Sequence, residues 1–519
     1  MVEGAMTLHQ ASVDATAASR VEDTAGVEFE VVIGLEVHVE LLTRTKLFCG
    51  CPNRFGGSPN TQVCPVCLGL PGTLPVLNRA AVDQVLRAAL ILDCEIPRHS
   101  KFDRKNYFYP DMPRNFQISQ YDRPLAVHGH LDVETSDGGV RRVGILRIHL
   151  EEDTGKSTHG GGSGRIESAE YTLEDYNRAG VPLAEIVSEP DLASADEAAC
   201  YLTRLRERLR WAGVSDCKME EGSLRCDANV SVRPRGAVAL GTRAEIKNMN
   251  SIRSVARAIE HEWRRQVEVV RSGRAVVQET RAWDEDRGVT HSLRSKEEAN
   301  DYRYFPEPDL VPLEVDDVWM ARIRASLPEP AQDRRRRIAA AYALSDYDAT
   351  ALTRSRAFAD FFERVVVGGS GALAKEAANW LLGDVSRLLN ANNESIENAK
   401  FGPEGLREMM ALVEDGVISK KLAKDVLDEM FASGASPKSI VDAHGWRQIG
   451  SSDDLRPVVR GVVERHPGVV DDYLGGKEKA FGFLVGQVMA TTRGKASPAV
   501  ANTLLREVLE ERRARQEET

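Results

Sequence analysis

The stretch Val31-Val-Ile-Gly-Leu-Glu-Val-His-Val-Glu-Leu41 alternates between apolar side chains at its odd positions and mainly small or polar ones between them. Successive side chains of a β-strand point to opposite faces of its sheet, so this period of two predicts a strand with one buried face. The even positions place Glu36 and His38 close together on the other face. Considered alone, this stretch favours an ordinary solvated face over a functional site.

The same period recurs in three later stretches, Val143–Glu151, Leu224–Arg233 and Arg243–Met249. In the first of these we expect Leu146, Ile148 and Leu150 on the buried face. The opposite faces collect acidic, amide and basic groups, namely Arg147, His149, Glu151, Arg225, Asp227, Asn229, Ser231, Arg233, Arg243, Glu245 and Lys247, and Glu152 and Asp153 follow the first stretch. Solvated strands usually mix Thr, Lys and Glu, so this clustering favours a shared functional site.

Clustered carboxylates with few histidines are the hard oxygen donors that Mg²⁺ prefers. A cation shared by such carboxylates can hold nucleotide phosphates, and neighbouring Arg and Lys side chains suit a phosphoryl group in transfer. The polar strand faces therefore predict a metal-dependent phosphate site with Glu36 and His38 at its centre.

The segment Glu151-Glu-Asp-Thr-Gly-Lys156-Ser-Thr ends like a phosphate-binding P-loop. The P-loop pattern requires glycine at the position of Leu150, and the three acidic residues that follow would repel a bare phosphate. We therefore reject a P-loop and keep a metal-mediated phosphate site, to which Lys156 is a candidate contributor.

Four cysteines, Cys49, Cys51, Cys64 and Cys67, follow the spacing CxC-x12-CxxC. Two close pairs of thiolates match a tetrahedral zinc site, and four protein ligands leave no position for water. We predict a structural zinc within an insertion over residues 49–67, in preference to four unrelated thiols.

Two segments, Lys101–Asp111 and Asp301–Asp309, interleave aromatic residues with basic and acidic ones. Bases of single-stranded RNA ends stack on such aromatic rings and guanidinium groups. A buried corner in which tyrosine hydroxyls bond to aspartates explains the same residues equally well, so both interpretations stay open.

The 519 residues exceed one compact core and are expected to form two to four domains. The net charge of −11 argues against nucleic acid covering most of the surface, but not against a local basic groove.

The sequence has no run of about 18 apolar residues, so no membrane span is expected. Residues 1–28 lack the features of a secretory signal and are expected to be a disordered extension. The cysteine usage fits a reducing cytoplasm.

Apolar periods near 3.6 residues predict helices among and after the strands. These are Arg79–Leu92, Ala195–Trp211, Arg253–Arg271, Arg334–Tyr342, Ala357–Val367 and Ala372–Asn390, with short capped helices after Gly402, Ser419 and Ser497. The fold class is therefore α+β, and we divide the chain into domains at 29–310, 311–400 and 401–519.

These stretches together resemble one family, the B subunits of bacterial aspartyl-tRNA(Asn)/glutamyl-tRNA(Gln) amidotransferases. The resemblance extends from about Glu28 to the C-terminus. It is carried by Val32–Glu40, Lys101–Asp111, Gln117–Gln120, Leu150–His159, Glu185–Asp191, Met219–Asn229, Glu245–Asn248, Asp301–Asp309 and Gly482–Gln487.

The resemblance implies a heterotrimer, in which an A subunit, an amidase, releases ammonia from glutamine and a small C subunit holds A and B together. The B subunit uses ATP and Mg²⁺ to phosphorylate the side-chain carboxylate of misacylated Asp-tRNA(Asn) or Glu-tRNA(Gln), and ammonia then displaces the phosphate. The implied fold is a cradle domain around an antiparallel β-sheet, a helical domain and a small all-α YqeY-like tail that contacts tRNA. This chain shows no amidase constellation of its own, which agrees with a separate glutaminase.

Carried over by position, the resemblance implies site residues of three kinds. The candidate catalytic residues are Glu36, His38, Glu151, Glu152 and Lys247. The candidate ATP-binding residues are Lys156, Glu220, Arg225, Asp227, Asn229 and Glu245. The candidate Mg²⁺ ligands are Glu36, His38, Glu152 and Glu185. Some family members lack the zinc cysteines, so a supporting role for zinc is expected.

The alternative is a zinc-containing RNA-binding scaffold without chemistry of its own. The acid-rich strand faces argue against it, because an RNA binder avoids placing carboxylates near phosphate. A free-standing kinase is disfavoured because the sequence has no glycine-rich phosphate loop.

Overall fold

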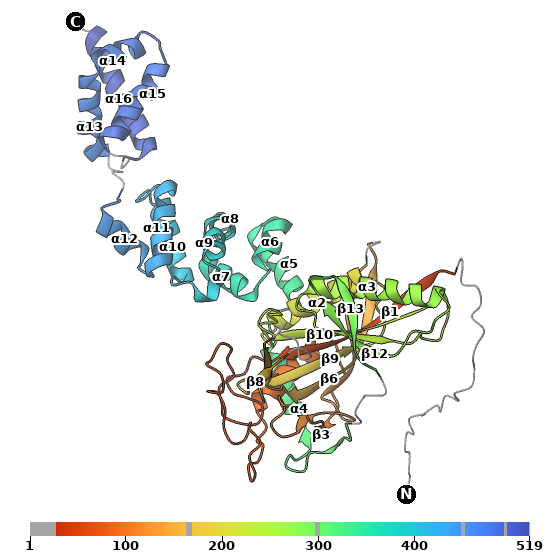
Figure 1. Cartoon of the computed structure of the whole chain (residues 1–519). Coiled ribbons are helices and arrows are strands. Elements are labelled where there is room, and N and C mark those ends of the chain that lie inside the picture. The colour runs from red at the N-terminus through yellow and green to blue at the C-terminus, as the bar shows by residue number, and fades with distance from the viewer. Residues whose placement is uncertain are drawn as a thin grey trace. The chain divides into compact units, whose positions relative to one another are not determined.

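The computed structural model describes residues 27–135, 138–161, 169–295, 302–447, 452–492 and 496–517. It forms two compact units, 1–328 and 329–519, which are considered separately (Figure 1). The extension predicted at 1–28 lies, apart from its last two residues, outside the described residues, as does Asp301.

An eight-stranded sheet forms the centre of the first unit. Its strand order is β13 (Val289–Ser295), β12 (Glu279–Asp284), β11 (Ala244–Lys247), β10 (Leu224–Pro234), β1 (Phe29–Glu40), β9 (Pro182–Ser188), β6 (Val140–Glu152) and β5 (Ala126–Glu134). Neighbouring strands are antiparallel except β11 and β12. The predicted α+β class with a largely antiparallel sheet is confirmed, and the four predicted polar strands are β1, β6, β10 and β11.

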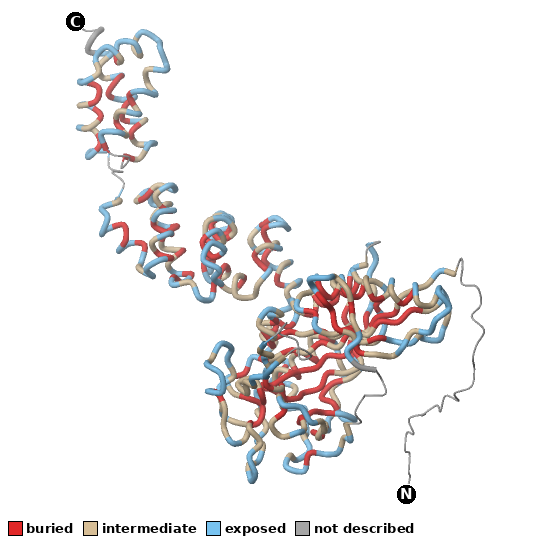
Figure 2. Tube along the Cα trace, viewed as in Figure 1, coloured by how far each residue is buried: buried red, intermediate tan, exposed pale blue. Residues whose placement is uncertain are grey.

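Three helices pack against one face of this sheet: α1 (Arg79–Ile91), α2 (Ala195–Trp211) and α3 (Ile252–Arg271). The side chains of Asn78, Ser194 and Ser251 accept backbone N–H groups of the first turns and so begin these helices. The odd residues of β1 from Ile33 to Val39 are buried and belong to the same hydrophobic cluster as these helices. Buried residues run through the sheet of this unit (Figure 2). Both the apolar face of β1 and the three helices were predicted.

One prediction about β6 is wrong. Leu146 is not on the buried face, because the register between β6 and β9 shifts between Ile145 and Arg147. A β-bulge adds one residue to a strand and reverses the alternation beyond it. The buried face of β6 therefore contains Ile145 and Ile148, and Leu146 joins the polar face.

A three-stranded sheet covers part of the polar face. It consists of β14 (Phe305–Pro306), β3 (Asp103–Asn106) and β4 (Phe116–Ser119). The end of β6 holds β4 in place, because Ser119 Oγ donates to Glu151 Oε2 at 2.8 Å and Ile118 N–H donates to Glu152 Oε1 at 3.0 Å. Two short antiparallel pairs complete the strands, β2 (His99–Ser100) with β15 (Leu313–Glu314) and β7 (Lys156–Gly160) with β8 (Tyr171–Asp175). The helix α4 (Asp317–Ser326) ends this unit.

The second unit is helical. Its helices are α5 (Ala331–Tyr342), α6 (Asp346–Leu352), α7 (Arg356–Val366), α8 (Gly371–Trp380), a π-helical turn (Leu381–Val385), α9 (Ser386–Ala391), a 3₁₀ turn (Ile396–Asn398), α10 (Pro403–Glu414), α11 (Lys420–Ser433), α12 (Pro437–His444), α13 (Ser452–Arg465), α14 (Pro467–Leu474), α15 (Lys479–Thr491) and α16 (Pro498–Glu517). One hydrophobic cluster extends from Ile338 to Val441, and another from Leu455 to Leu509.

The predicted domain divisions after residues 310 and 400 stay predictions, while the structural division lies after Pro328. Among the described helices, none combines the length and the apolar character needed to cross a membrane.

Candidate functional site

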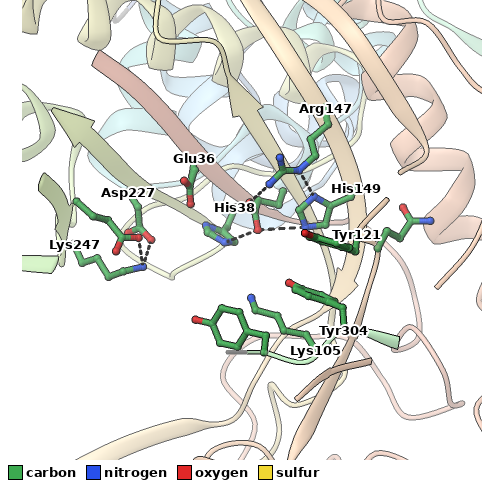
Figure 3. Close-up of a pocket in the computed structure, with 13 residues that line it drawn as sticks. Glu36, His38, Lys105, Tyr121, Arg147, His149, Asp227, Lys247 and Tyr304 are labelled. Atoms are coloured by element: carbon green, nitrogen blue, oxygen red, sulfur yellow. Dashed lines mark hydrogen bonds and ion pairs between the residues drawn. The ribbon is translucent and has the colours of Figure 1, made fainter. Parts of the chain in front are cut away.

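A cavity of about 320 Å³ lies between the polar face of the large sheet and the three-stranded sheet (Figure 3). We call it the charged cavity. The large sheet contributes Glu36, His38, Arg147, His149, Glu185, Asp227, Glu245 and Lys247 to its lining. The segments around β3, β4 and β14 contribute Lys105, Gln120, Tyr121, Tyr302 and Tyr304. Seven of the polar strand residues noticed in the sequence therefore meet at one cavity, namely Glu36, His38, Arg147, His149, Asp227, Glu245 and Lys247.

The strand register brings these residues together. His38 on β1 lies opposite Glu185 on β9, and Glu185 lies opposite His149 on β6. On the other side of β1, Glu36 lies opposite Asp227 on β10. Directly opposed side chains have Cβ atoms roughly 5 Å apart, close enough for hydrogen bonds and ion pairs. The four strands thus present one continuous row of ionisable groups.

The histidines His38 and His149 share the carboxylate of Glu185. Nε2 of each lies 3.3 Å from Oε2 of Glu185 (Figure 3). His149 Nε2 also lies 3.5 Å from Oε2 of Glu151. His149, Glu151 and Glu185 are buried, and buried carboxylates are costly unless they have partners. The two imidazoles are those partners.

The charges of this cluster shift the pKa values of its members. Burial alone would lower the pKa of His149, but the charge of Glu185 and the hydrogen bond to Glu151 raise it to about 9. Burial likewise opposes the charge of Glu185, yet His149 and His38 hold the pKa of this carboxyl well below its usual range. Glu185 is therefore an anion held between two imidazoles, a strongly perturbed group in a cavity, which is typical of functional sites.

The side chains of His38, Glu151 and Glu185 fit a divalent cation. One ligand atom of each lies within 4.8 Å of the others. Two carboxylates and one imidazole, with space beside them for water or phosphate oxygens, suit Mg²⁺ or Mn²⁺. His149 orients both carboxylates of this set.

A second acidic cluster lies on β10 and β11. Lys247 Nζ lies 2.6 Å from Asp227 Oδ2 and 3.0 Å from Glu245 Oε1. Burial would lower the pKa of Lys247, but these two carboxylates raise it, so it stays an ammonium. Asn229 Nδ2 donates to Glu36 Oε1 at 2.9 Å, and burial together with the charges of Glu185 and Glu245 raises the pKa of Glu36. The ammonium of Lys247 and the carboxyl of Glu36, whose pKa is raised, therefore both face the charged cavity.

A second cavity of about 370 Å³ adjoins the first and shares Glu36 and Arg147 with it. We call it the apolar cavity. Its other lining residues are Val32, Gly34, Leu35, Leu146, Val187, Ser188, Glu189, Pro190, Asn229, Ser231, Leu240, Gly241 and Arg243. Eight small or apolar residues and seven polar or charged ones form its wall, a composition that suits a flat organic ligand with polar edges.

Four of the predicted catalytic, ATP-binding and Mg²⁺-binding residues lie outside both cavities and outside the cation-binding set. Glu152 is buried, but its carboxylate accepts hydrogen bonds from Arg114 and from the backbone of Ile118. Arg225 donates to Asp153 Oδ2 at 2.5 Å. Lys156 is exposed on β7, and Glu220 is exposed in the turn before β10. The other predicted residues of β1, β6, β9, β10 and β11 reach one or both cavities or the cation-binding set.

Sequence reasoning did not assign Lys105, Gln120, Tyr121, Tyr302 and Tyr304 to the site. Three of them belong to the two aromatic and basic segments, whose composition was the available signal. Arg147 and His149 were recognised on a polar strand face but were not selected as site residues.

The four cysteines of the insertion form a separate cluster. One sulfur of each of Cys49, Cys51, Cys64 and Cys67 lies within 4.8 Å of the others, and the Cys64 and Cys67 sulfurs are 3.9 Å apart. Two sulfurs bound to one zinc at about 2.3 Å are roughly 3.8 Å apart, so the set fits zinc.

A buried lysine accompanies this cluster. Lys46 is 0% exposed, and its Nζ lies 3.7 Å from Cys67 Sγ and 3.2 Å from the Tyr176 carbonyl oxygen. A hydrogen bond with Cys49 and the charge of Lys46 lower the pKa of Cys67 to about 4. Cys67 is therefore held in the thiolate form that binds metal.

Comparison with known families and proteins gives a consistent result. The family model of the GatB/GatE catalytic domain matches residues 31–321, and that of the GatB domain, of YqeY type, matches residues 360–509. The second match confirms the predicted YqeY-like tail.

Curated proteins named as the B subunits of aspartyl/glutamyl-tRNA(Asn/Gln) amidotransferases are similar over most of the chain. The Moorella thermoacetica protein is 55% identical over 483 residues, which cover 93% of this chain and 100% of the relative. The Carboxydothermus hydrogenoformans protein is 53% identical over 482 residues, and the Brevibacillus brevis protein is 52% identical over 482 residues. These two alignments each cover 93% of this chain and 99% of the relative.

Proposed function

Because this chain belongs to the GatB/GatE family, we propose that it is the B subunit of a glutamine-dependent aspartyl/glutamyl-tRNA(Asn/Gln) amidotransferase. It phosphorylates the side-chain carboxylate of misacylated Asp-tRNA(Asn) or Glu-tRNA(Gln) and amidates it, giving Asn-tRNA(Asn) or Gln-tRNA(Gln). The enzyme is then an ATP-consuming carbon–nitrogen ligase. The observation that carries this proposal is the pair of cavities that adjoin at Glu36 and Arg147.

The two cavities suit the two ends of ATP. The apolar cavity is large enough for a purine and its ribose, and the backbone and hydroxyl groups of its wall offer hydrogen bonds. The charged cavity offers the cations Lys105, Arg147 and Lys247 to the phosphates. A nucleotide that crosses the shared boundary at Glu36 therefore places its terminal phosphate beside His38 and Glu185.

In the first step, an oxygen of the substrate carboxylate attacks the γ-phosphorus of ATP, and the bond from that phosphorus to the β-phosphate oxygen breaks. This gives an acyl phosphate and ADP. The residues of this chain position both reactants and balance the charge of the transferring group through Arg147 and Lys247. His38, Glu151 and Glu185 would hold a divalent cation, which would supply further charge neutralisation at the phosphate oxygens.

In the second step, the nitrogen of ammonia attacks the acyl carbon, and inorganic phosphate leaves with the carbon–oxygen bond electrons. The new amide nitrogen must lose one proton. Glu36 lines the cavity and has a raised pKa, so its carboxylate is a suitable acceptor. Glu245 and Asp227 keep Lys247 charged beside it.

This sequence contains no recognisable amidase constellation, which agrees with ammonia being supplied by another polypeptide. We propose a heterotrimer with a glutaminase A subunit and a C subunit, working in the cytoplasm on misacylated tRNA. The relatives are named as B subunits, which supports a multi-subunit enzyme. The zinc held by the cysteine cluster has a structural role in this proposal.

The test is to purify the chain with its partner subunits and to assay ATP-dependent amidation of Asp-tRNA(Asn) and Glu-tRNA(Gln). The His38→Ala variant should lose phosphoryl transfer, measured as substrate-dependent ADP release, while the complex still assembles. The matched control is His130→Ala, since His130 lies on β5 of the same sheet and lines neither cavity. Full amidation by the His38 variant would refute the proposed site. Tight tRNA binding by the wild type with no ADP release would favour an RNA-binding scaffold instead.

A further inference from the structure

An exposed aromatic side chain borders the charged cavity. Tyr121 lines this cavity, yet it is 60% exposed. Its ring stacks on Tyr304, with the centroids 4.3 Å apart and the planes 10° from parallel. Tyr302 contacts Tyr304 edge-on at 6.2 Å. The inner face of Tyr121 is thus covered, and much of the rest of the ring is accessible to solvent.

The backbone that carries Tyr121 is held firmly. Its N–H donates to Asp103 Oδ2 at 3.1 Å, and Asp103 is buried and paired with Lys101. The preceding residue, Gln120, accepts the Leu150 N–H at 3.0 Å and donates to Ser100 Oγ at 2.6 Å. The ring is therefore presented from a fixed loop, and a change of its side chain leaves these bonds in place.

The neighbouring tyrosines are fixed in a similar way. Asn106 N–H donates to the Tyr302 carbonyl at 2.9 Å, and Asn106 Nδ2 donates to the Arg303 carbonyl at 2.9 Å. Arg303 has a φ of 44°, an unfavourable value for a residue with a side chain, which these bonds help to maintain. The stack of Tyr304 and Tyr121 is therefore a prearranged surface.

We propose that Tyr121 stacks on the 3′-terminal base of the aminoacyl-tRNA. This inference rests on the proposed function, in which the side-chain carboxylate of the esterified amino acid enters the charged cavity. The amino acid is attached to the terminal ribose, so this ribose lies only a few bonds from the cavity and its base lies at the mouth. Flat, exposed aromatic rings bind such unpaired bases by stacking.

The charges around the stack favour a nucleotide, rather than an apolar protein segment, as its binding partner. Lys105 Nζ lies 5.1 Å from the centre of the Tyr302 ring, and Arg303 lies 6.0 Å from that of the exposed Phe108. A terminal nucleotide brings a phosphate together with its base. The exposed Arg303 complements that phosphate, while Lys105 lines the adjoining charged cavity.

The test compares two small substrates with the assembled enzyme. One is the glutamyl ester of adenosine, and the other is the glutamyl ester of the same ribose without a base. The KM of each is measured through ATP-dependent ADP release, with wild type, Tyr121→Ala and Tyr121→Phe. Tyr347→Ala is the control, since Tyr347 is exposed on α6 and lines neither cavity.

In the wild type the base should lower KM by about 5–150-fold, the equivalent of about 1–3 kcal/mol of stacking. Tyr121→Ala should remove this advantage with little change of kcat, and Tyr121→Phe and Tyr347→Ala should keep it. An undiminished advantage in Tyr121→Ala would overturn the proposal. So would an equal loss for both esters, or turnover of aminoacyl-tRNA without turnover of the adenosine ester.

Two further outcomes are distinguishable from these. Absence of ADP release with both esters and with Asp-tRNA(Asn) and Glu-tRNA(Gln) would overturn the proposed function, and the stacking role with it. Dissociation of the partner subunits from Tyr121→Ala, seen by size-exclusion chromatography, would reassign Tyr121 to a protein interface.

Discussion

Nε2 of His38 on β1 lies 3.3 Å from Oε2 of Glu185 on β9, and the two residues are direct cross-strand partners. The same oxygen of Glu185 lies 3.3 Å from Nε2 of His149, so one carboxylate links the histidines of two strands that do not pair with each other. This arrangement makes Glu185 the central anion of the site. It also explains how a carboxylate is accommodated in a buried position on a mainly apolar strand.

The variant Glu185→Gln should therefore lose both cation binding and catalysis. Glutamine is similar in shape but carries no charge, so it neither attracts a cation nor balances two histidines. We expect the affinity for Mn²⁺, followed by electron paramagnetic resonance, to fall by at least about 10–100-fold, with a similar or larger loss of ADP release. Glu134→Gln is the control, because Glu134 is exposed on β5. Unchanged Mn²⁺ binding by Glu185→Gln would contradict the assignment.

The apolar cavity can be tested by filling it. Gly34 lines this cavity, and a Cβ added there would meet Pro190 only at ordinary contact distances of 3.7 and 3.9 Å. Gly34→Leu should project into the cavity and raise the KM for ATP by about 10-fold or more, on the order of 1.4 kcal/mol. Gly34→Ala should raise it much less. Tight tRNA binding should persist in both variants, and an unchanged ATP KM in Gly34→Leu would exclude this cavity as the nucleotide site.

The cysteine cluster should hold one zinc per chain, measured by elemental analysis. Cys64→Ser should lose it, whereas Cys200→Ser, at a cysteine outside the cluster, should keep it. Lys46→Met removes the cation beside Cys67 and should weaken zinc binding by about 10–100-fold, measured by competition with a chromogenic chelator. Zinc retention by Lys46→Met equal to that of the wild type would show that this lysine only fills space.

The interior of the first unit contains a carboxylate with a structural role. Glu262 on α3 is 0% exposed and accepts hydrogen bonds from Arg265, Gln266 and Thr290. Burial alone would raise the pKa of Glu262, but the hydrogen bonds of Arg265 and Gln266 lower it below its ordinary value near 4.5. Because the folded-state pKa is depressed, the stabilisation is complete above about pH 4.5 and is lost as the pH falls through the folded-state pKa.

Glu262→Gln should therefore lower the free energy of unfolding by about 3 kcal/mol at neutral pH, measured by urea denaturation. The difference from the wild type should shrink as the pH falls below the ordinary pKa of glutamate. Glu268→Gln, at an exposed position of the same helix, should change the free energy by less than about 0.5 kcal/mol. A difference that is independent of pH would contradict a role for the charge.

The last hydrophobic cluster, Leu455 to Leu509, should be separable from the rest of the chain. A chain that ends after Arg447 keeps the cluster from Ile338 to Val441 intact, so the remaining helices should stay folded. Since the sequence predicts a tRNA-binding tail, this truncation should weaken tRNA binding by about 10-fold or more in a filter-binding assay. Amidation of the adenosine ester should persist. Unchanged tRNA affinity would remove that role from residues 448–519.

Local sequence determined much of this protein. The period of two in Val31–Leu41 predicts which face of β1 is buried, because side-chain direction in a strand depends only on position along it. The spacing of Cys49, Cys51, Cys64 and Cys67 likewise predicts a four-thiolate cluster, because each close pair of cysteines lies within one short turn of the chain. The helices of both units follow from apolar periods and capping residues that lie next to one another in the chain.

The tertiary structure decided which charges meet. Glu152 meets Arg114 and the Ile118 N–H only because the small sheet docks against the end of β6. The register shift at Ile145 moved Leu146, and strand pairing brought Glu185 beside His38. Register and the docking of the small sheet depend on contacts between distant segments, and no local pattern encodes them. The strand that carries Glu36 and His38 is therefore predictable from the local sequence, whereas the residues that surround them in the site depend on the tertiary structure.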